Sequence, residues 1–108
     1  MGTTLPAKAM AVANSDVNVY TCPTTGVSFV AVNILLTNQD TVNAAHAKIW
    51  IGPGPTPAPD DYVDFNIPMN AAPGSYERVK MLVYPGESVF VNCDNANVSI
   101  RVYGIPQA

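Results

Sequence analysis

Apolar and polar residues alternate in a series of short segments along most of the chain. Near the C-terminus, for example, Val98, Ile100 and Val102 share one face of an extended chain, with Ser99 and Arg101 on the other. A period of two is typical of a β-strand with one buried face. Turn signals rich in Pro, Gly, Asn and Asp separate the segments. The pattern predicts seven strands, at residues 16–22, 27–38, 43–51, 62–67, 75–84, 88–93 and 98–105.

No segment has the periodicity of an amphipathic helix, and seven short strands separated by turns are typical of two packed sheets. We therefore predict an all-β fold, a single antiparallel β-sandwich of about seven strands, in residues 16–108. A jelly roll usually needs eight strands and a longer chain, so we prefer the simpler sandwich. Residues 1–15 are rich in Ala and Thr without a clear period. We predict an N-terminal arm there, which packs on a partner or stays mobile.

Three regions allow finer predictions. Residues 27–38 are apolar on both faces, which favours a central strand with both faces covered. The strand at 75–84 alternates throughout, so Tyr76 and Leu82 are expected on the same face. The last two predicted strands have matching apolar faces, and we expect them to form a hairpin.

The strand at 43–51 carries the one tryptophan and the one histidine of the chain. Alternation places Ala and Ile on one face, and His46, Lys48 and Trp50 on the other. We expect this second face to be partly exposed, with His46 at the surface. A catalytic histidine needs a partner that orients it, and the sequence suggests none.

Charged residues make up only 12% of the 108 residues, against about 25% in an ordinary soluble domain. Charged residues are depleted at the centres of protein interfaces. We therefore expect faces that are covered by partner proteins, and a homo-oligomer. A small secreted domain rich in Thr and Asn is the alternative.

The charge balance argues against nucleic acid as a partner, and the apolar pattern argues against a membrane. The five Lys and Arg residues form no basic run and the net charge is −3, so we expect no nucleic-acid binding. No apolar run approaches the roughly 20 residues of a membrane span, and the start lacks the pattern of a signal peptide. We expect synthesis and assembly in a cytoplasm, without a membrane partner.

No catalytic, phosphate-binding or zinc-binding motif is present, and we predict no enzyme activity and no cofactor. Asp60, Asp61 and Asp64 cluster, but a calcium ion takes about six to eight oxygen ligands. We expect Asp60 or Asp61 to close a loop by accepting hydrogen bonds from backbone N–H groups instead. Cys22 and Cys93 are expected to be small buried hydrophobes in a reducing cytosol, with a disulfide as the alternative.

Two stretches of the chain, residues 17–40 and 61–105, resemble a group of small virion proteins of tailed bacteriophages. The shared features are a strand that ends in a turn, a "DYV" strand, a "GE-VFV" strand, and an Asn-Val junction before an "RVYG" strand. The matching residues are Tyr20, Thr21, Pro23, Gly26, Asp61, Tyr62, Val63, Gly86, Glu87, Val89, Val91, Asn97, Val98, Arg101, Val102, Tyr103 and Gly104. The resemblance implies a non-enzymatic part of the particle, on the capsid, the neck or the tail.

The composition and the resemblance together predict a structural virion component, assembled in the host cytoplasm, that decorates or cements the particle. Its partners would be other virion proteins, such as major capsid, neck or tail subunits. A module that binds host-surface carbohydrate through Trp50 and nearby tyrosines is the alternative. The expected contact residues come from the arm, the aromatic face and a stiff proline-rich loop: Leu5, Pro6, Trp50, Pro53, Pro55, Pro57 and Pro59.

Overall fold

The computed structural model describes residues 5–107, and it confirms the all-β antiparallel sandwich. Within those residues, eight strands and one turn of 3-10 helix follow one another. They are β1 (Ala7–Met10), β2 (Ser15–Thr21), β3 (Phe29–Asn38), β4 (Ala45–Gly52), η1 (Pro59–Asp61), β5 (Tyr62–Met69), β6 (Ser75–Val83), β7 (Ser88–Cys93) and β8 (Val98–Gln107). No helix in this part of the chain is long and apolar enough to span a membrane.

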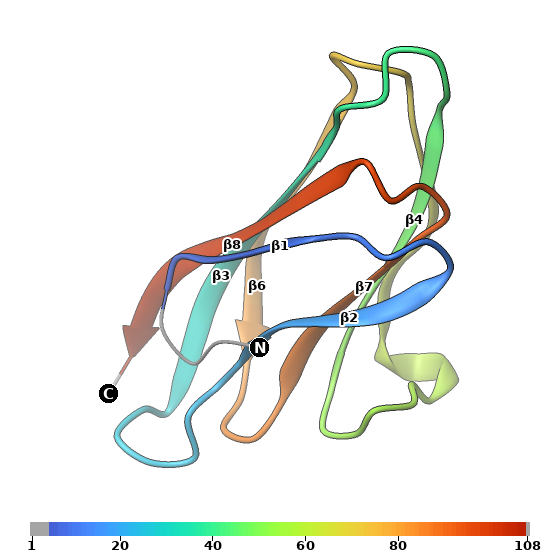
Figure 1. Ribbon diagram of the computed structural model, residues 1–108. Helices are drawn as coiled ribbons and strands as arrows, with labels where there is room; N and C mark the ends of the chain where they lie inside the picture. Colours follow the sequence, from blue (N-terminus) through green and yellow to red (C-terminus); the bar gives the residue numbers. More distant parts are fainter. Residues whose placement is uncertain (1–4, 108) are drawn as a thin grey trace.

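The strands pair in a nested order. β4 pairs with β5, β3 with β6, β2 with β7 and β1 with β8, all antiparallel, as in one long hairpin folded back on itself. Further pairing of β3 with β8 and of β4 with β7 rolls this hairpin into two sheets. Their strand orders are β1-β8-β3-β6 and β2-β7-β4-β5 (Figure 1). Eight strands in this double-sheet arrangement form a jelly roll, which the sequence analysis had disfavoured.

The eighth strand comes from residues that were predicted to form an arm. β1 lies at the edge of its sheet and pairs with β8 from Ala7 to Met10. Ala7 and Ala11 are buried in the core, which ties the segment to the sandwich. The prediction of a free arm is therefore wrong for residues 7–11. Alanine side chains are too small to produce a visible apolar pattern, although they fit a crowded core. Residues 1–4 of the predicted arm lie outside the described part of the chain.

The predicted hairpin of the last two strands is also wrong. β7 lies between β2 and β4, whereas β8 lies between β1 and β3 in the other sheet. Val91 of β7 and Ile100 of β8 are both buried in the same core. Their apolar faces pack against each other across the core, from opposite sheets. Alternation alone does not distinguish such packing from pairing of the two strands within one sheet.

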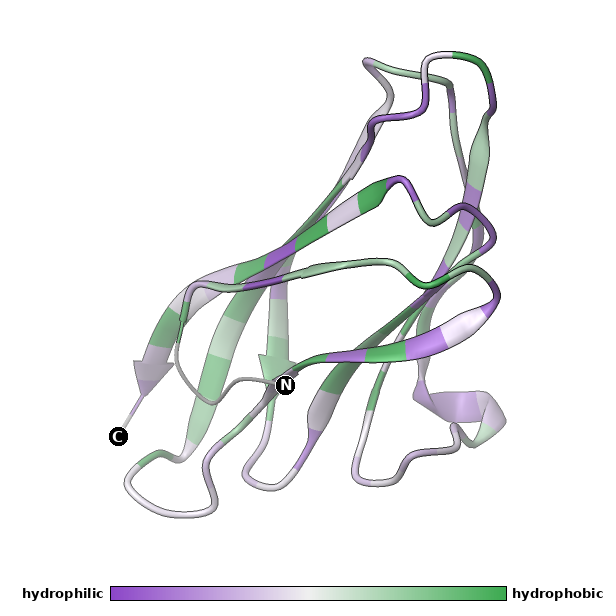
Figure 2. Cartoon of the chain, viewed as in Figure 1, coloured by the Kyte–Doolittle hydropathy of each residue, from purple (hydrophilic) through white to green (hydrophobic). Residues whose placement is uncertain are grey.

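β3 is a central strand, as predicted, with β8 on one side and β6 on the other. Its core-facing side chains are completely buried, from Val30 to Leu36. The opposite face, which includes Ala31 and Leu35, is only half-buried. The prediction of two covered faces is therefore wrong for this outer face. Figure 2 shows the nearly continuous apolar colouring of β3 beside the alternating colours of β8.

An irregularity in β6 reverses its alternation. Lys80 has a φ of 60°, and the register against β3 shifts in the same region. A bulge inserts an extra residue, so side chains beyond it change faces. Tyr76 consequently packs against the core while Leu82 is exposed, although both were predicted on one face.

Both cysteines belong to the core. Cys22 and Cys93 are fully buried and unbonded to each other, as expected of small hydrophobes. Burial raises the pKa of each thiol above its usual value. The thiols are therefore protonated at neutral pH, which makes them poor nucleophiles and poor metal ligands.

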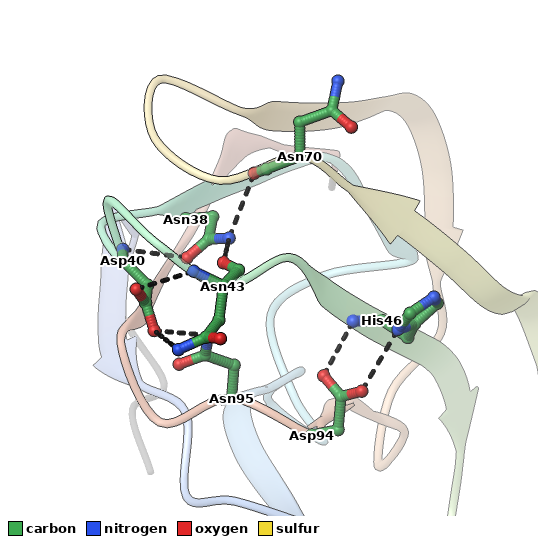
Figure 3. A network of polar contacts seen from close by, with 7 residues as sticks. All are labelled: Asn38, Asp40, Asn43, His46, Asn70, Asp94 and Asn95. Atoms are coloured by element: carbon green, nitrogen blue, oxygen red, sulfur yellow. Dashed lines mark hydrogen bonds and ion pairs between the residues drawn. The ribbon is translucent and has the colours of Figure 1, made fainter.

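Polar side chains fasten three loops together at one end of the sandwich (Figure 3). The buried Asn38 amide donates hydrogen bonds to the backbone carbonyls of Asn43 and Asn70, both at 3.0 Å. The Asp40 carboxylate accepts from the backbone N–H groups of Val42 and Asn43. It also accepts from the side-chain amides of Asn43 and Asn95. Side chains therefore hold these loops together with single backbone bonds, such as that from the Ala72 N–H to the Asp40 carbonyl.

We predict that Asn38→Ala destabilises the fold by about 1–3 kcal/mol, because the buried Asn38 amide is removed and two backbone carbonyl oxygens lose their donor. Urea denaturation followed by circular dichroism measures the change. The neighbouring Gln39 is exposed, so Gln39→Ala serves as a control with little expected effect. Equal stability of the two variants would contradict a structural role for Asn38.

The Asp40 network should make stability depend on acidity. Its hydrogen bonds, first those from the backbone of Asn43 and Val42, hold the pKa of Asp40 far below its usual range. A lowered pKa adds stability above the unfolded-state pKa of about 3.9, and this stability is lost as the pH falls toward the folded-state pKa. We expect Asp40→Asn to be less stable than the wild type at pH 6, and the difference to shrink below about pH 4. Urea titrations from pH 2 to pH 7 test this, with Asp60→Asn in the exposed proline-rich loop as a control of equal charge change. A pH-independent difference would contradict the assignment.

Candidate functional site

Two shallow grooves lie next to each other on the outer face of the β1-β8-β3-β6 sheet. They share Leu35 and Arg101. The larger one, which we call the β8 groove, has a volume of about 600 Å³. It is lined by Leu5, Pro6, Asn33, Leu35, Arg101, Tyr103, Gly104 and Ile105. The smaller one, the β1 groove, measures about 470 Å³ and is lined by Lys8, Ala9, Met10, Leu35, Thr37, Ser99, Ile100 and Arg101.

Outward-facing side chains of β8 form part of the floor of the β8 groove. Val98, Ile100 and Val102 face the core, so the side chains between and after them face outward. The outward residues lie opposite those of β3: Arg101 opposite Leu35, Tyr103 opposite Asn33, and Ile105 opposite Ala31. The groove is therefore assembled from two strands that lie far apart in the sequence.

Gly104 allows β8 and β3 to approach closely beside the groove. A Cβ atom at this position would lie 2.0 Å from the backbone oxygen of Ala31 and 2.8 Å from the Cα of Val32. Backbone atoms cannot move aside as the end of a side chain can. The sequence therefore needs glycine here, and the groove gains a stretch of uncovered backbone.

The polar residues of the groove are held by neighbours. The Tyr103 hydroxyl donates a hydrogen bond to the Glu77 carboxylate of β6. This bond, followed by partial burial, raises the pKa of Tyr103, so the ring stays neutral. The Asn33 side-chain oxygen accepts a hydrogen bond of 2.9 Å from the backbone N–H of Lys80. Both side chains are thus fixed in position before any partner binds.

Two cations lie directly opposite each other between the grooves. Lys8 of β1 is the cross-strand partner of Arg101 of β8, and both side chains are exposed. Like charges in this position destabilise a sheet. Among residues 5–107, neither cation takes part in an ion pair. The nearest carboxylate along this row is Glu77, which lies beyond Leu35 and accepts the bond from Tyr103. This part of the face therefore attracts negative charge.

An apolar strip continues from the β8 groove across the sheet. Ile105 is 67% exposed, Leu82 is 43% exposed, and Ala31 lies between them in the same row. In the next row, the ring of Tyr84 contacts that of Phe29 at 6.3 Å between centroids, and Tyr84 is 50% exposed. The outer face of this sheet thus combines a groove, two cations and exposed apolar side chains.

The structure separates the predicted contact residues into three places. Leu5 and Pro6 line the β8 groove, next to Tyr103 and Ile105. The four prolines at 53, 55, 57 and 59 lie in the connection between β4 and β5, which belong to the other sheet. Pro57 is partly buried and the other three are exposed, and Pro59 begins η1. The loop is closed by Asp61, which accepts a 2.9 Å hydrogen bond from the backbone N–H of Ala58, as expected.

Trp50 is the third case, and its expected exposure is wrong. The ring points to the outer side of its sheet, as alternation predicted, yet it is completely buried. It stacks on Phe90 of β7 at 3.9 Å between centroids, with an interplanar angle of 2°. Tyr62 of β5 is its cross-strand partner on the other side. Neighbouring strands therefore cover the ring, and their identity does not follow from the sequence of one strand.

The titratable residues considered for chemistry have structural contacts. His46 is half-exposed, and its Nδ1 lies 3.1 Å from Asp94. Asp64 accepts a 2.9 Å hydrogen bond from the Tyr76 hydroxyl and lies 3.8 Å from Arg78, which joins β5 to β6 across the side of the sandwich. Within the described range, no three His, Cys, Asp or Glu residues are placed to hold a metal ion.

Most of the β8 groove was not predicted from the sequence. Ser99, Arg101 and Tyr103 were assigned to the polar face of the last strand, and Ile105, which follows them on that face, breaks the polar pattern. The second apolar face of β3 was another available signal for the groove. An apolar outer face indicates a surface that is either covered or used for interaction. Neither signal shows that the two strands are neighbours.

Comparisons with known proteins add no assignment. No family model, no curated protein and no solved structure matches the chain.

Proposed function

We propose that the protein is a non-enzymatic structural component of a bacteriophage virion. It decorates or cements the capsid, or occupies the neck or tail, through the outer face of the β1-β8-β3-β6 sheet. Its partners are other virion proteins, and further copies of the chain are expected in a repeated or symmetric arrangement.

The exposed apolar strip on this sheet is the observation that carries the proposal. Leu82, Tyr84 and Ile105 lie on or beside strands of one sheet and keep between 43% and 67% of their surface exposed. Apolar side chains gathered on one face, rather than scattered singly, are typical of an interaction site. The β8 groove extends this surface with Leu5, Pro6 and Leu35.

Fold and composition also favour a structural component of a viral particle. Double-sheet jelly rolls are frequent in viral capsid proteins and in lectins. A charged fraction of 12% suits a protein whose faces are covered in an assembly. The resemblance of residues 17–40 and 61–105 to virion proteins of tailed bacteriophages directs the proposal toward a phage particle.

The carbohydrate-binding alternative has less support. It depended on Trp50, whose ring is buried between neighbouring strands and cannot stack on a sugar. The proline-rich loop stays available as a second contact with a neighbour, because three of its four prolines are exposed. No specific observation favours sugar over protein as the partner.

We expect the double variant Leu82→Asp, Ile105→Asp to fold normally but to leave the particle. The two side chains are exposed, so folding loses little, whereas a protein interface would have to bury two unpaired charges. Association with purified particles should fall by at least tenfold. Gradient sedimentation followed by immunoblotting measures association, and circular dichroism measures folding.

Val42 provides the matched control, because it is 80% exposed in the β3–β4 loop, away from this face. Val42→Asp should stay on the particle at the wild-type level. If the double variant also sediments with particles at that level, the outer face is not the attachment surface.

A further inference from the structure

β8 is paired along its whole length on one side only. Against β3 it pairs over all ten residues, from Val98 to Gln107. Against β1 it pairs only from Ser99 to Val102. Within residues 5–107, residues 103–107 therefore pair with no strand on this open edge, although Leu5 and Pro6, just before β1, line the groove beside them. The β8 groove lies along this open edge, because Tyr103, Gly104 and Ile105 line it.

The backbone groups that face the open edge can be identified from the neighbouring bonds. Alternate residues of a central strand direct their backbone N–H and C=O groups to opposite neighbours. The N–H of Ala11 donates to the C=O of Val98, so the even-numbered residues of β8 point toward β1. The C=O of Gln107 instead accepts from Ser28, which precedes β3. Gly104 thus presents its N–H and its C=O to the open edge, and Pro106 presents only its C=O.

Pro106 fits this assignment. Proline has no N–H to donate, so it occurs in strands where that side has no ladder partner. Here the missing donor falls on the open side of β8, and the ladder to β3 loses nothing. The open edge accordingly has one donor and two acceptors over residues 104–106.

The other edges of the two sheets are poor templates for an added strand. The free edge of β1 is only four residues long and carries Lys8, and β2, β5 and β6 each contain a register shift. β6 also has charged side chains at Arg78 and Lys80. Bulges and edge charges are common devices against unwanted strand pairing. The edge at residues 103–107 has no register shift against β3. It is therefore the edge best suited to accept another strand.

The charges at the end of this edge select an acidic partner. Arg101 lies two residues before Tyr103 on the same outer face, with Lys8 opposite it. Diagonal neighbours across two strands are within reach of long side chains. A carboxylate at the end of an added strand would separate the two cations and compensate their repulsion.

We propose that an extended segment of a neighbouring virion protein, bearing one Asp or Glu, adds as a strand to β8 along residues 103–107. The segment bonds to Gly104 and Pro106, lays its outward side chains against Tyr103 and Ile105, and places its carboxylate beside Arg101 and Lys8. This inference rests on the proposed function and names the kind of partner at the same surface.

A second copy of the chain fits this edge less well. An antiparallel pairing of two β8 edges that avoids β1 sets Gly104 of one copy opposite Pro106 of the other. Pro106 has no N–H, so the C=O of Gly104 stays without a partner in both copies. Gln107 is the residue opposite Tyr103 in that pairing, and its side chain carries no charge.

The first test is site-specific cross-linking in assembled particles. A photoreactive phenylalanine analogue replaces Ile105, and mass spectrometry identifies the segment to which it becomes linked. The same analogue at Phe65 is the control, because Phe65 is 64% exposed but belongs to β5 in the other sheet. We expect position 105, and not position 65, to reach one segment of another virion protein that contains Asp or Glu.

The second test uses a synthetic peptide of the cross-linked segment with the purified full chain. Hydrogen exchange measured by NMR should show slower exchange of the Gly104 amide when the peptide is bound. Arg101→Gln should weaken binding by about two- to fivefold, as expected for one exposed charge pair. Replacing the peptide's acid by its amide should weaken binding equally, and the two changes together should add little further loss.

Several results would overturn the inference. They are a cross-link to a second copy of the chain, a cross-linked segment without an acid, or an unprotected Gly104 amide in the complex. If the wild-type chain is missing from purified particles, the proposed function fails and the inference fails with it. If the chain is present but position 105 forms no such cross-link, the inference alone fails.

Discussion

The ladder between β3 and β8 is the contact on which the rest of the molecule depends. It pairs ten residues of each strand without a register shift, from Phe29 with Gln107 to Asn38 with Val98. Together with the pairing of β4 and β7, it turns a nested hairpin into two sheets around one core. The close approach at Gly104, where any Cβ would meet the Ala31 carbonyl, is part of this ladder. The core, the outer face and both grooves are consequences of the same pairing.

The outer faces of the two sheets differ in how their apolar side chains are covered. On the β2-β7-β4-β5 sheet, the stacked rings of Trp50 and Phe90 cover each other and are buried without a second layer. On the β1-β8-β3-β6 sheet, Ile105 and Leu82 stay exposed, and grooves run along β8 and β1. The first face keeps one exposed aromatic ring, Phe65, which contacts Tyr62 and Lys48. The second face combines exposed apolar side chains with grooves and uncovered backbone. This asymmetry is the reason for assigning the interaction surface to the second sheet.

Polar side chains join separate elements at several places in the sandwich. Asn38 and Asp40 hold the loops at one end, and Asp64 connects β5 with β6 along one side. Lys8 and Arg101 are the exception, because they face each other without an anion among the described residues. Two like charges kept together at the edge of a groove favour a partner that carries the opposite charge.

The sequence by itself determined the strands and much of their orientation. Alternation identified seven of the eight strands, with ends within about two residues, because a half-buried strand requires a period of two. It also placed Cys22 and Cys93 inside, and Asp61 at the end of the proline-rich loop. These are local properties, set by residues that are close along the chain.

Only the tertiary structure decided which strands are neighbours, and the candidate site follows from that choice. Whether β7 pairs with β8 or faces it across the core leaves their patterns unchanged, so the predicted hairpin was wrong. Trp50 was predicted on the correct face but is buried, stacked on Phe90 of β7 and beside its cross-strand partner Tyr62 of β5. The β8 groove joins Leu5 and Pro6 to Arg101 and Ile105, nearly one hundred positions later. Periodicity describes how each strand faces the core, whereas a surface also depends on the long-range pairing that places strands side by side.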